Sequence, residues 1–174
     1  ILLTLIATSL HSDDLMNPTT YSKDLYAEVI LDGNYSNDIS HPDEFLEFSI
    51  GERVAKPSEI SNAINTWKTQ SDRIKVVEYA KSHEGRPLHA VFISSPKNIN
   101  NLDSIKNSIN QLSDARKTSD REARSIIEEL PAIAWMAYSI HGNETSGADA
   151  AFAAIYHLLA SNDDEAVSYT HLTL

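Results

Sequence analysis

Residues 132–144 read Ala132-Ile133-Ala134-Trp135-Met136-Ala137-Tyr138-Ser139-Ile140-His141-Gly142-Asn143-Glu144, an apolar run that leads into a polar loop. The run is apolar at both alternating sets of positions, which is typical of a strand covered on both faces, as in the middle of an α/β sheet. After the loop, residues 147–159 are small or apolar nearly all round, and Thr145 or Ser146 can cap them as a helix. The sequence therefore predicts a buried strand, a loop at its carboxyl end and a closely packed helix.

Two potential metal ligands, His141 and Glu144, lie three positions apart in this loop. Ligand sites in open α/β folds gather beyond the carboxyl ends of the strands. A neutral imidazole and a carboxylate both suit Zn²⁺, and two histidines with one glutamate form a known catalytic zinc set with water at the open position. Gly142 allows a sharp backbone turn, and Asn143 can bond the loop backbone. The pattern predicts that His141 and Glu144 bind one Zn²⁺ ion.

A second interpretation of Glu144 is compatible with the first. The carboxylate could stabilise the N-terminus of the following helix, where the helix dipole favours negative charge. The His-x-x-Glu pattern is short and arises often by chance. The apolar run before it, Gly142 within it and the small-residue helix after it together favour the metal site.

The remaining elements are predicted from periodicity and turn residues. Residues 56–70 open with Lys-Pro-Ser-Glu and carry apolar residues at helical spacing. Residues 74–79 and 88–93 are β-branched and aromatic, and the short link between them favours an antiparallel pair. Residues 102–112 and 121–130 each carry an apolar stripe at helical spacing.

Composition excludes several classes of function. The 174 residues carry a net charge of −11 and no long basic run, so nucleic acid is not expected as a partner. The chain has no cysteine, which excludes disulfides, cysteine catalysis and thiolate metal sites. No segment is long and apolar enough for a stable membrane span. The oligomeric state is not predicted.

The chain begins with an apolar run, residues 1–10, that is too short to cross a bilayer. It is similar to the back half of a signal peptide, although a buried first strand is the alternative. We therefore expect residues 1–12 to be a signal-peptide remnant of a secreted or periplasmic protein. Residues 13–55 are expected to form a polar lead-in segment, 56–167 a catalytic-domain segment, and 168–174 a tail that continues nothing before it.

Three segments carry a family resemblance. Residues 139–150, which include His141 and Glu144, resemble the zinc-binding segment of the zinc metallocarboxypeptidases. Residues 82–88 resemble the Glu-Gly-Arg turn between the first two strands of that family, and residues 94–99 resemble the link after the second strand, as secreted bacterial members have it. Order and spacing agree from about His41 to Glu165, which is the front part of the family's catalytic domain.

The resemblance implies a three-layer α/β/α domain around a mixed, partly parallel sheet, with one Zn²⁺ ion held by His141, Glu144 and a later histidine. It implies a metallocarboxypeptidase that hydrolyses C-terminal peptide bonds of peptides or proteins through a metal-activated water. The third ligand, the general-base glutamate and the carboxylate-binding arginine are expected beyond residue 174, so no catalytic residue is assigned within the chain. The 174-residue chain is accordingly expected to be an inactive fragment. Glu84 and Arg86 match a structural turn of the family rather than its catalytic residues.

Two other functions are compatible with the loop. A zinc amidohydrolase of the aspartoacylase and succinylglutamate desuccinylase type shares the fold type and a His-Gly-Asn-Glu loop, but acts on N-acyl amino acids. A non-catalytic relative could keep the two ligands without the base. The Glu-Gly-Arg turn and the apolar start of the chain favour the carboxypeptidase.

Overall fold

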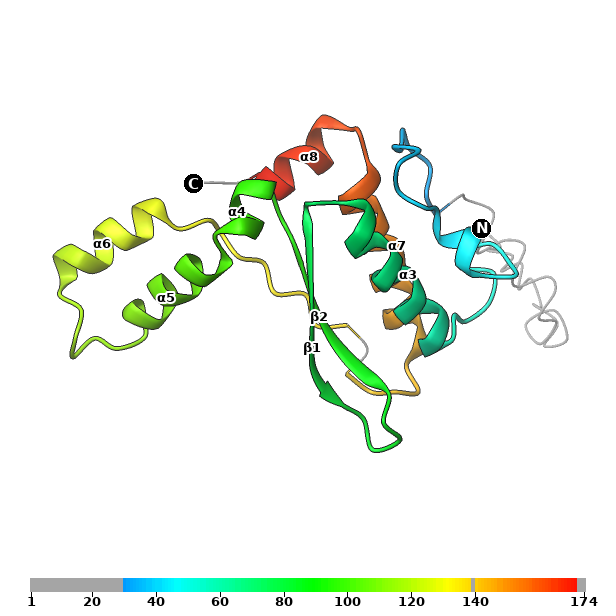
Figure 1. Ribbon diagram of the computed structural model, residues 1–174, viewed down its shortest axis with the longest axis horizontal. Coiled ribbons are helices and arrows are strands. Elements are labelled where there is room, and N and C mark those ends of the chain that lie inside the picture. Colours follow the sequence, from blue (N-terminus) through cyan, green and yellow to red (C-terminus); the bar gives the residue numbers. More distant parts are fainter. Residues whose placement is uncertain (1–29, 139, 172–174) are drawn as a thin grey trace, which may run out of the picture. The chain divides into compact units, whose positions relative to one another are not determined.

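The computed structural model describes residues 30–138 and 140–171 (Figure 1). Their elements, in chain order, are η1 (Pro42–Phe45), α3 (Pro57–Gln70), β1 (Ile74–Lys81), β2 (Pro87–Ile93), α4 (Pro96–Asn100), α5 (Leu102–Leu112), α6 (Asp120–Glu129), α7 (Thr145–Ala160) and α8 (Asp164–His171). The predicted signal-peptide remnant, residues 1–12, lies outside the described residues. Within the described part, no helix has the length and apolar content needed to cross a membrane.

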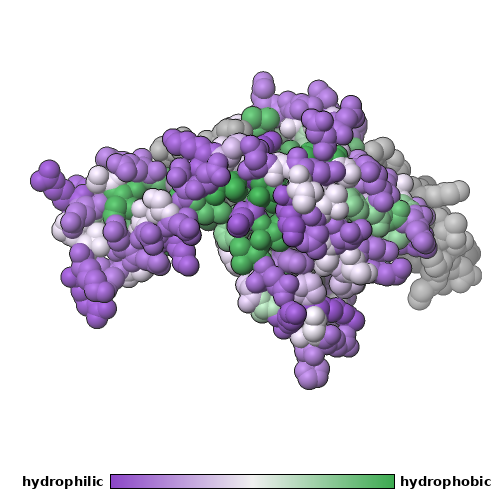
Figure 2. All heavy atoms as spheres, in the orientation of Figure 1, coloured by the Kyte–Doolittle hydropathy of each residue, from purple (hydrophilic) through white to green (hydrophobic). Residues whose placement is uncertain are grey.

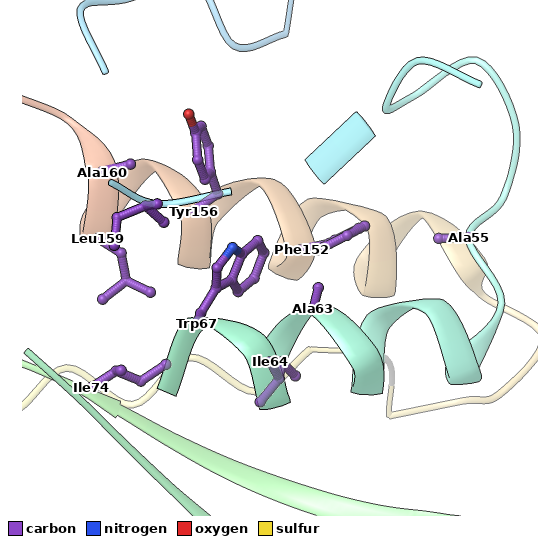
Figure 3. Close-up of a cluster of buried hydrophobic side chains, with 10 residues drawn as sticks. Ala55, Ala63, Ile64, Trp67, Ile74, Phe152, Tyr156, Leu159 and Ala160 are labelled. Carbon is purple, nitrogen blue, oxygen red and sulfur yellow. The ribbon is translucent and has the colours of Figure 1, made fainter. Parts of the chain in front are cut away.

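The core lies between α3 and α7. Trp67 of α3 and Phe152 of α7 are fully buried, and their ring centroids are 5.4 Å apart. Tyr156, one turn further along α7, also contacts Trp67, with ring centroids 6.2 Å apart. Figure 3 shows the two helices side by side, with Trp67 reaching from α3 toward α7. The apolar stripe predicted for residues 56–70 is therefore the face that α3 buries, and Trp67 is a core residue as its spacing indicates.

The segment from Leu31 to Ala55, here called the N-terminal strap, contributes to the same core. Ile39 and Ala55 are buried with the α3 and α7 side chains. The Trp67 ring nitrogen donates a hydrogen bond to Ser40 O over 2.8 Å. The described residues from Leu31 onwards form one compact unit. The part of the lead-in segment that the structure describes thus packs with the domain that follows it.

β1 and β2 form the predicted antiparallel hairpin, with Ile74 opposite Ile93 at its base. Ile74 and Ile93 face the core, because Ile74 is buried and Ile93 packs against the core cluster. The hairpin turns at Gly85, whose φ of 79° lies in the left-handed region that glycine adopts without strain. Ser82 N donates to Arg86 O over 2.8 Å and closes the turn.

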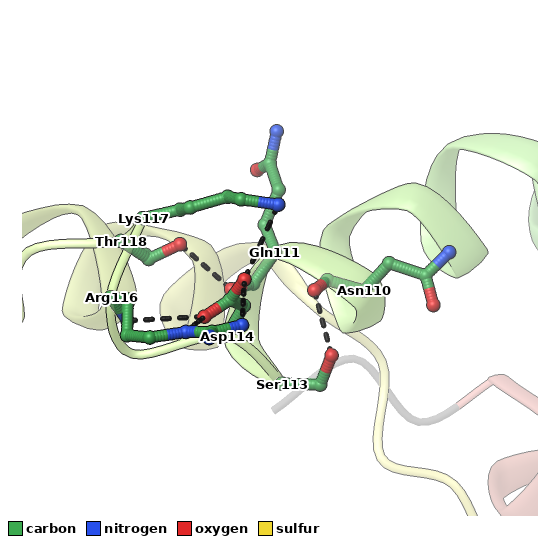
Figure 4. A network of polar contacts seen from close by, with 7 residues as sticks. All are labelled: Asn110, Gln111, Ser113, Asp114, Arg116, Lys117 and Thr118. Atoms are coloured by element: carbon green, nitrogen blue, oxygen red, sulfur yellow. Dashed lines mark hydrogen bonds and ion pairs between the residues drawn. The ribbon is translucent and has the colours of Figure 1, made fainter.

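Helices α5 and α6 contact each other and are joined by a polar link. Asp114 in this link binds the Arg116 guanidinium over 2.9 Å and the Lys117 ammonium over 3.3 Å (Figure 4). The hydrogen bonds from Arg116 lower the pKa of Asp114, so they favour the charged form of its carboxylate. Ser119 then caps α6 in a capping box with Glu122.

The covered strand predicted at residues 132–140 does not form among the described residues. Residues 132–138 form no ladder with another strand, and the sheet of the described chain contains β1 and β2 alone. Trp135 is 82% exposed and Ile140 is 79% exposed. A strand that is apolar on both sides needs neighbours on both edges and layers on both faces, and within the described residues β1 and β2 pair only with each other. The structure therefore shows a mixed helix-and-strand fold with a two-stranded antiparallel sheet.

The C-terminal segment is helical as far as it is described. Residues 164–171 form α8, so the tail expected from residue 168 onwards continues a helix up to His171. Ala166 is 3% exposed, and Ser95 N donates to Thr170 O over 2.7 Å. These contacts give the helix a packed face, which the polar sequence of the segment does not indicate.

Candidate metal site

His141 and Glu144 lie in the loop that joins the extended segment 132–138 to α7. Glu144 N donates to His141 O over 3.0 Å, which closes a tight turn between the two residues. Glu144 is the N-cap residue of α7, with φ −94° and ψ 75°. The turn therefore sets both side chains at the start of the helix, as the sequence predicts.

The two predicted ligands converge. His141 Nδ1 lies 3.0 Å from Glu144 Oε2. Two ligand atoms bound to a tetrahedral Zn²⁺ ion at 2.0–2.2 Å lie about 3.4 Å apart. The pair would thus separate by about 0.4 Å to bind one ion, a small movement for two side chains that are 69% and 65% exposed. The donor set and its spacing fit two of the four ligand positions of a zinc ion.

The capping alternative for Glu144 receives less support from the geometry. Its side chain makes no capping hydrogen bond to the helix backbone, although it occupies the N-cap position. The carboxylate instead contacts the His141 ring. Such an exposed pair contributes little to folding stability. The contact therefore bears on where the two candidate ligands lie and not on what stabilises the fold.

The loop residues between the ligands differ from their predicted roles. The positive-φ glycines of the described residues are Gly51 and Gly85, so Gly142 does not use the left-handed region. A Cβ atom added to Gly142 would meet nothing within 4 Å. Asn143 makes no side-chain hydrogen bond with the described residues. Gly142 and Asn143 are the central residues of the turn that the Glu144–His141 backbone bond closes, and neither a positive φ at Gly142 nor a side-chain hydrogen bond from Asn143 contributes to it.

A third ligand is absent from the described part of the chain. No group of three or more His, Cys, Asp or Glu side chains lies close enough there to hold a metal ion. His89 pairs across the hairpin with Glu78, and His83 lies in the hairpin turn. Both histidines belong to the hairpin and lie outside the loop that carries His141 and Glu144.

The Glu-Gly-Arg turn is a structural element of the hairpin. Glu84 and Arg86 form an ion pair of 2.6 Å between side chains that are 65% and 61% exposed. Ser82 Oγ accepts a hydrogen bond from Arg86 N over 3.1 Å. These contacts lie within the turn itself, which fits a role in holding its shape.

One residue near the site is not singled out by the sequence pattern. Asp149, in the second turn of α7, accepts a hydrogen bond from Ala55 N over 2.9 Å. It is the only acidic residue of α7. Apart from His157, the other residues of this helix are small, apolar or uncharged polar. A lone carboxylate in such a helix is the signal that points to a specific partner.

The zinc carboxypeptidase family model matches residues 60–173, well over half of the chain. The chain belongs to the zinc carboxypeptidase family. The match begins within α3 and includes the hairpin, the loop with His141 and Glu144, and all of α7. No curated protein and no solved structure matches the chain significantly. The family is zinc-dependent and acts on peptide substrates, so the two converging candidate ligands lie in a chain whose family binds zinc.

Proposed function

We propose that the protein is a zinc metallocarboxypeptidase that hydrolyses C-terminal peptide bonds, with His141 and Glu144 as two ligands of its single Zn²⁺ ion. The observation that carries the proposal is the 3.0 Å approach of His141 Nδ1 to Glu144 Oε2 in a chain of this family. When bound, zinc supplies a Lewis acid that polarises a carbonyl and lowers the pKa of a bound water.

The residues of the loop have separate tasks in this proposal. The His141 ring binds the ion as a neutral donor, and the Glu144 carboxylate offsets one of its two positive charges. Both side chains are more than half exposed, which leaves room for a substrate to approach. A third histidine ligand, the general-base glutamate and the arginine that holds the substrate carboxylate are proposed to come from outside residues 1–174.

The finer fold is part of the same proposal. Residues 132–140 would be an inner strand of a three-layer α/β/α domain, which would cover the exposed side chains of Trp135 and Ile140. One face of the hairpin also exposes Val77 and Phe92, each about two fifths accessible. Figure 2 shows apolar surface of this kind, in green, among polar residues. Exposed apolar surface on both elements supports a covering layer.

The proposal includes export. Residues 1–10 are an apolar run that resembles part of a signal peptide, and this pattern supports a secreted or periplasmic location. Fusing residues 1–30 to a reporter that is active only after export tests it. Retention of the reporter in the cytoplasm would contradict the export proposal without affecting the zinc site.

Substrate choice tests the function directly. The intact protein, loaded with zinc, is incubated with peptides that have a free C-terminus, with the same peptides amidated at the C-terminus, and with N-acyl amino acids. We expect release of the C-terminal residue from the free peptides alone. Cleavage of only the N-acyl amino acids would favour an amidohydrolase, and no turnover by a zinc-loaded protein would favour a non-catalytic relative.

A further inference from the structure

The N-terminal strap runs along α7 in the opposite chain direction and contacts both of its ends. At the C-terminal end of the helix, Ser36 N donates to Ala160 O over 2.8 Å. At the N-terminal end, Ala55 N donates to Asp149 Oδ1 over 2.9 Å. Figure 3 shows Ala55 beside the first turns of α7, with Phe152 further along the helix. The strap is thus bonded to the end of α7 that carries Glu144.

The first two turns of α7 have few other anchors. The first fully buried side chain of the helix is Phe152, which lies about 12 Å from Glu144 along the helix axis. On the other side of the loop, residues 132–138 are exposed and unpaired. Within the described residues, the Asp149–Ala55 bond is the only hydrogen bond that joins residues 145–150 to another part of the chain. The position of the helix start therefore depends strongly on this contact.

The hydrogen bond from Ala55 N to Asp149 Oδ1 is suited to fixing the position of the start of α7. Ala55 is 5% exposed, so water competes little for its N–H, and a carboxylate acceptor makes the stronger kind of hydrogen bond. The next residue, Lys56, is the N-cap of α3, and its N–H donates to Glu59 Oε2 over 2.7 Å. Asp149 is three residues before Phe152, so it extends the buried face of α7 toward the loop. The bond links the beginnings of α3 and α7.

We propose that Asp149 is a positioning residue for the zinc site. Through the Ala55 N–H it fixes the first turns of α7, about 8 Å along the axis from Glu144, and so holds the Glu144 carboxylate beside His141, near the spacing that one ion requires. The strap, which precedes the family match at residue 60, is on this account part of the metal-binding unit. The inference rests on the proposed function, because it takes Glu144 as a zinc ligand.

The test measures zinc affinity by competition with a chromophoric chelator, in the intact protein and in matched variants. Asp149→Ala removes the acceptor, whereas Asp149→Asn keeps an acceptor oxygen and removes only the charge. The matched control is Tyr35→Phe, which removes the 3.0 Å hydrogen bond from the strap to His157 Nδ1 near the other end of α7. Thermal melts of the metal-free proteins record how far each variant loses stability.

We expect Asp149→Ala to weaken zinc binding about tenfold, the lower end of the range for groups that orient a metal ligand. Asp149→Asn should retain the wild-type affinity, and Tyr35→Phe should lose stability but no affinity. Unchanged affinity in Asp149→Ala, a loss in a folded Asp149→Asn, or an equal loss in Tyr35→Phe would overturn the inference. A His141→Ala arm separates the two proposals, because zinc binding that survives this change would overturn the proposed function itself.

Discussion

Trp67 offers the most specific prediction about how the 174-residue chain is held together. Its side chain is fully buried and contacts the rings of Phe45, Phe152 and Tyr156, while its ring nitrogen donates to Ser40 O. In Trp67→Phe, the lost hydrogen bond contributes about 1 kcal/mol. The cavity left by the smaller ring adds about 1–2 kcal/mol. We expect a total loss of about 2–3 kcal/mol, a large fraction of the stability of an ordinary domain.

The second tryptophan of the chain is the matched control. Trp135 is 82% exposed, so Trp135→Phe should change the free energy of unfolding by less than about 0.5 kcal/mol. Urea titrations of the 174-residue chain, followed by circular dichroism, measure both variants, and the fluorescence of each single-tryptophan protein reports its exposure. Equal destabilisation by the two changes would refute the reasoning, because it would require residues 132–138 to be packed as tightly as the α3–α7 core.

Three further predictions concern the turns, a helix cap and the isolated chain. Gly85→Ala should destabilise the hairpin by about 1 kcal/mol because φ is positive there, whereas Gly142→Ala should leave stability unchanged; thermal melts of both variants measure the difference. Hydrogen bonds from the Ser119 side chain and backbone lower the pKa of Glu122. The Glu122 carboxylate should therefore stabilise the fold fully above its unfolded-state pKa, and this stabilisation should be lost as the pH falls through the lower folded-state pKa. Urea titrations from neutral to acid pH should show that Glu122→Gln removes this part of the pH dependence. The purified 174-residue chain should bind zinc weakly and release no residue from peptides, because two ligands hold the ion poorly; peptidase turnover by that chain would contradict this expectation.

Local periodicity was sufficient to predict most elements of the described chain. The structure confirms the apolar stripe of α3, the hairpin with its turn at Gly85, and the helix after the loop that carries His141 and Glu144. Each of these elements depends on contacts within one segment or between neighbouring segments. The apolar run at residues 132–140 predicts a strand, but a strand also needs partners, which its own sequence does not specify. The structure leaves that run exposed, and among the described residues it pairs with no other strand.

At the candidate site, too, the sequence predicts contacts between nearby residues but not contacts between residues far apart in the chain. The spacing of His141 and Glu144 predicted that the two side chains would converge, because a tight turn determines their separation. The bond from Asp149 to Ala55 spans 94 positions of the chain, and no pattern around either residue specifies it. Asn143, expected to bond the loop backbone, makes no such side-chain hydrogen bond among the described residues, and the backbone bond from Glu144 to His141 closes the turn.

The most direct test of the central claim is the zinc content of the intact protein after dialysis, measured by elemental analysis. The account predicts one zinc per chain in the wild type and loss of that zinc in both His141→Ala and Glu144→Ala. The exposed turn residue His83 and the exposed α6 residue Glu128 provide matched controls, and their alanine variants should keep the metal. Stoichiometric zinc in either His141→Ala or Glu144→Ala would contradict the ligand assignment.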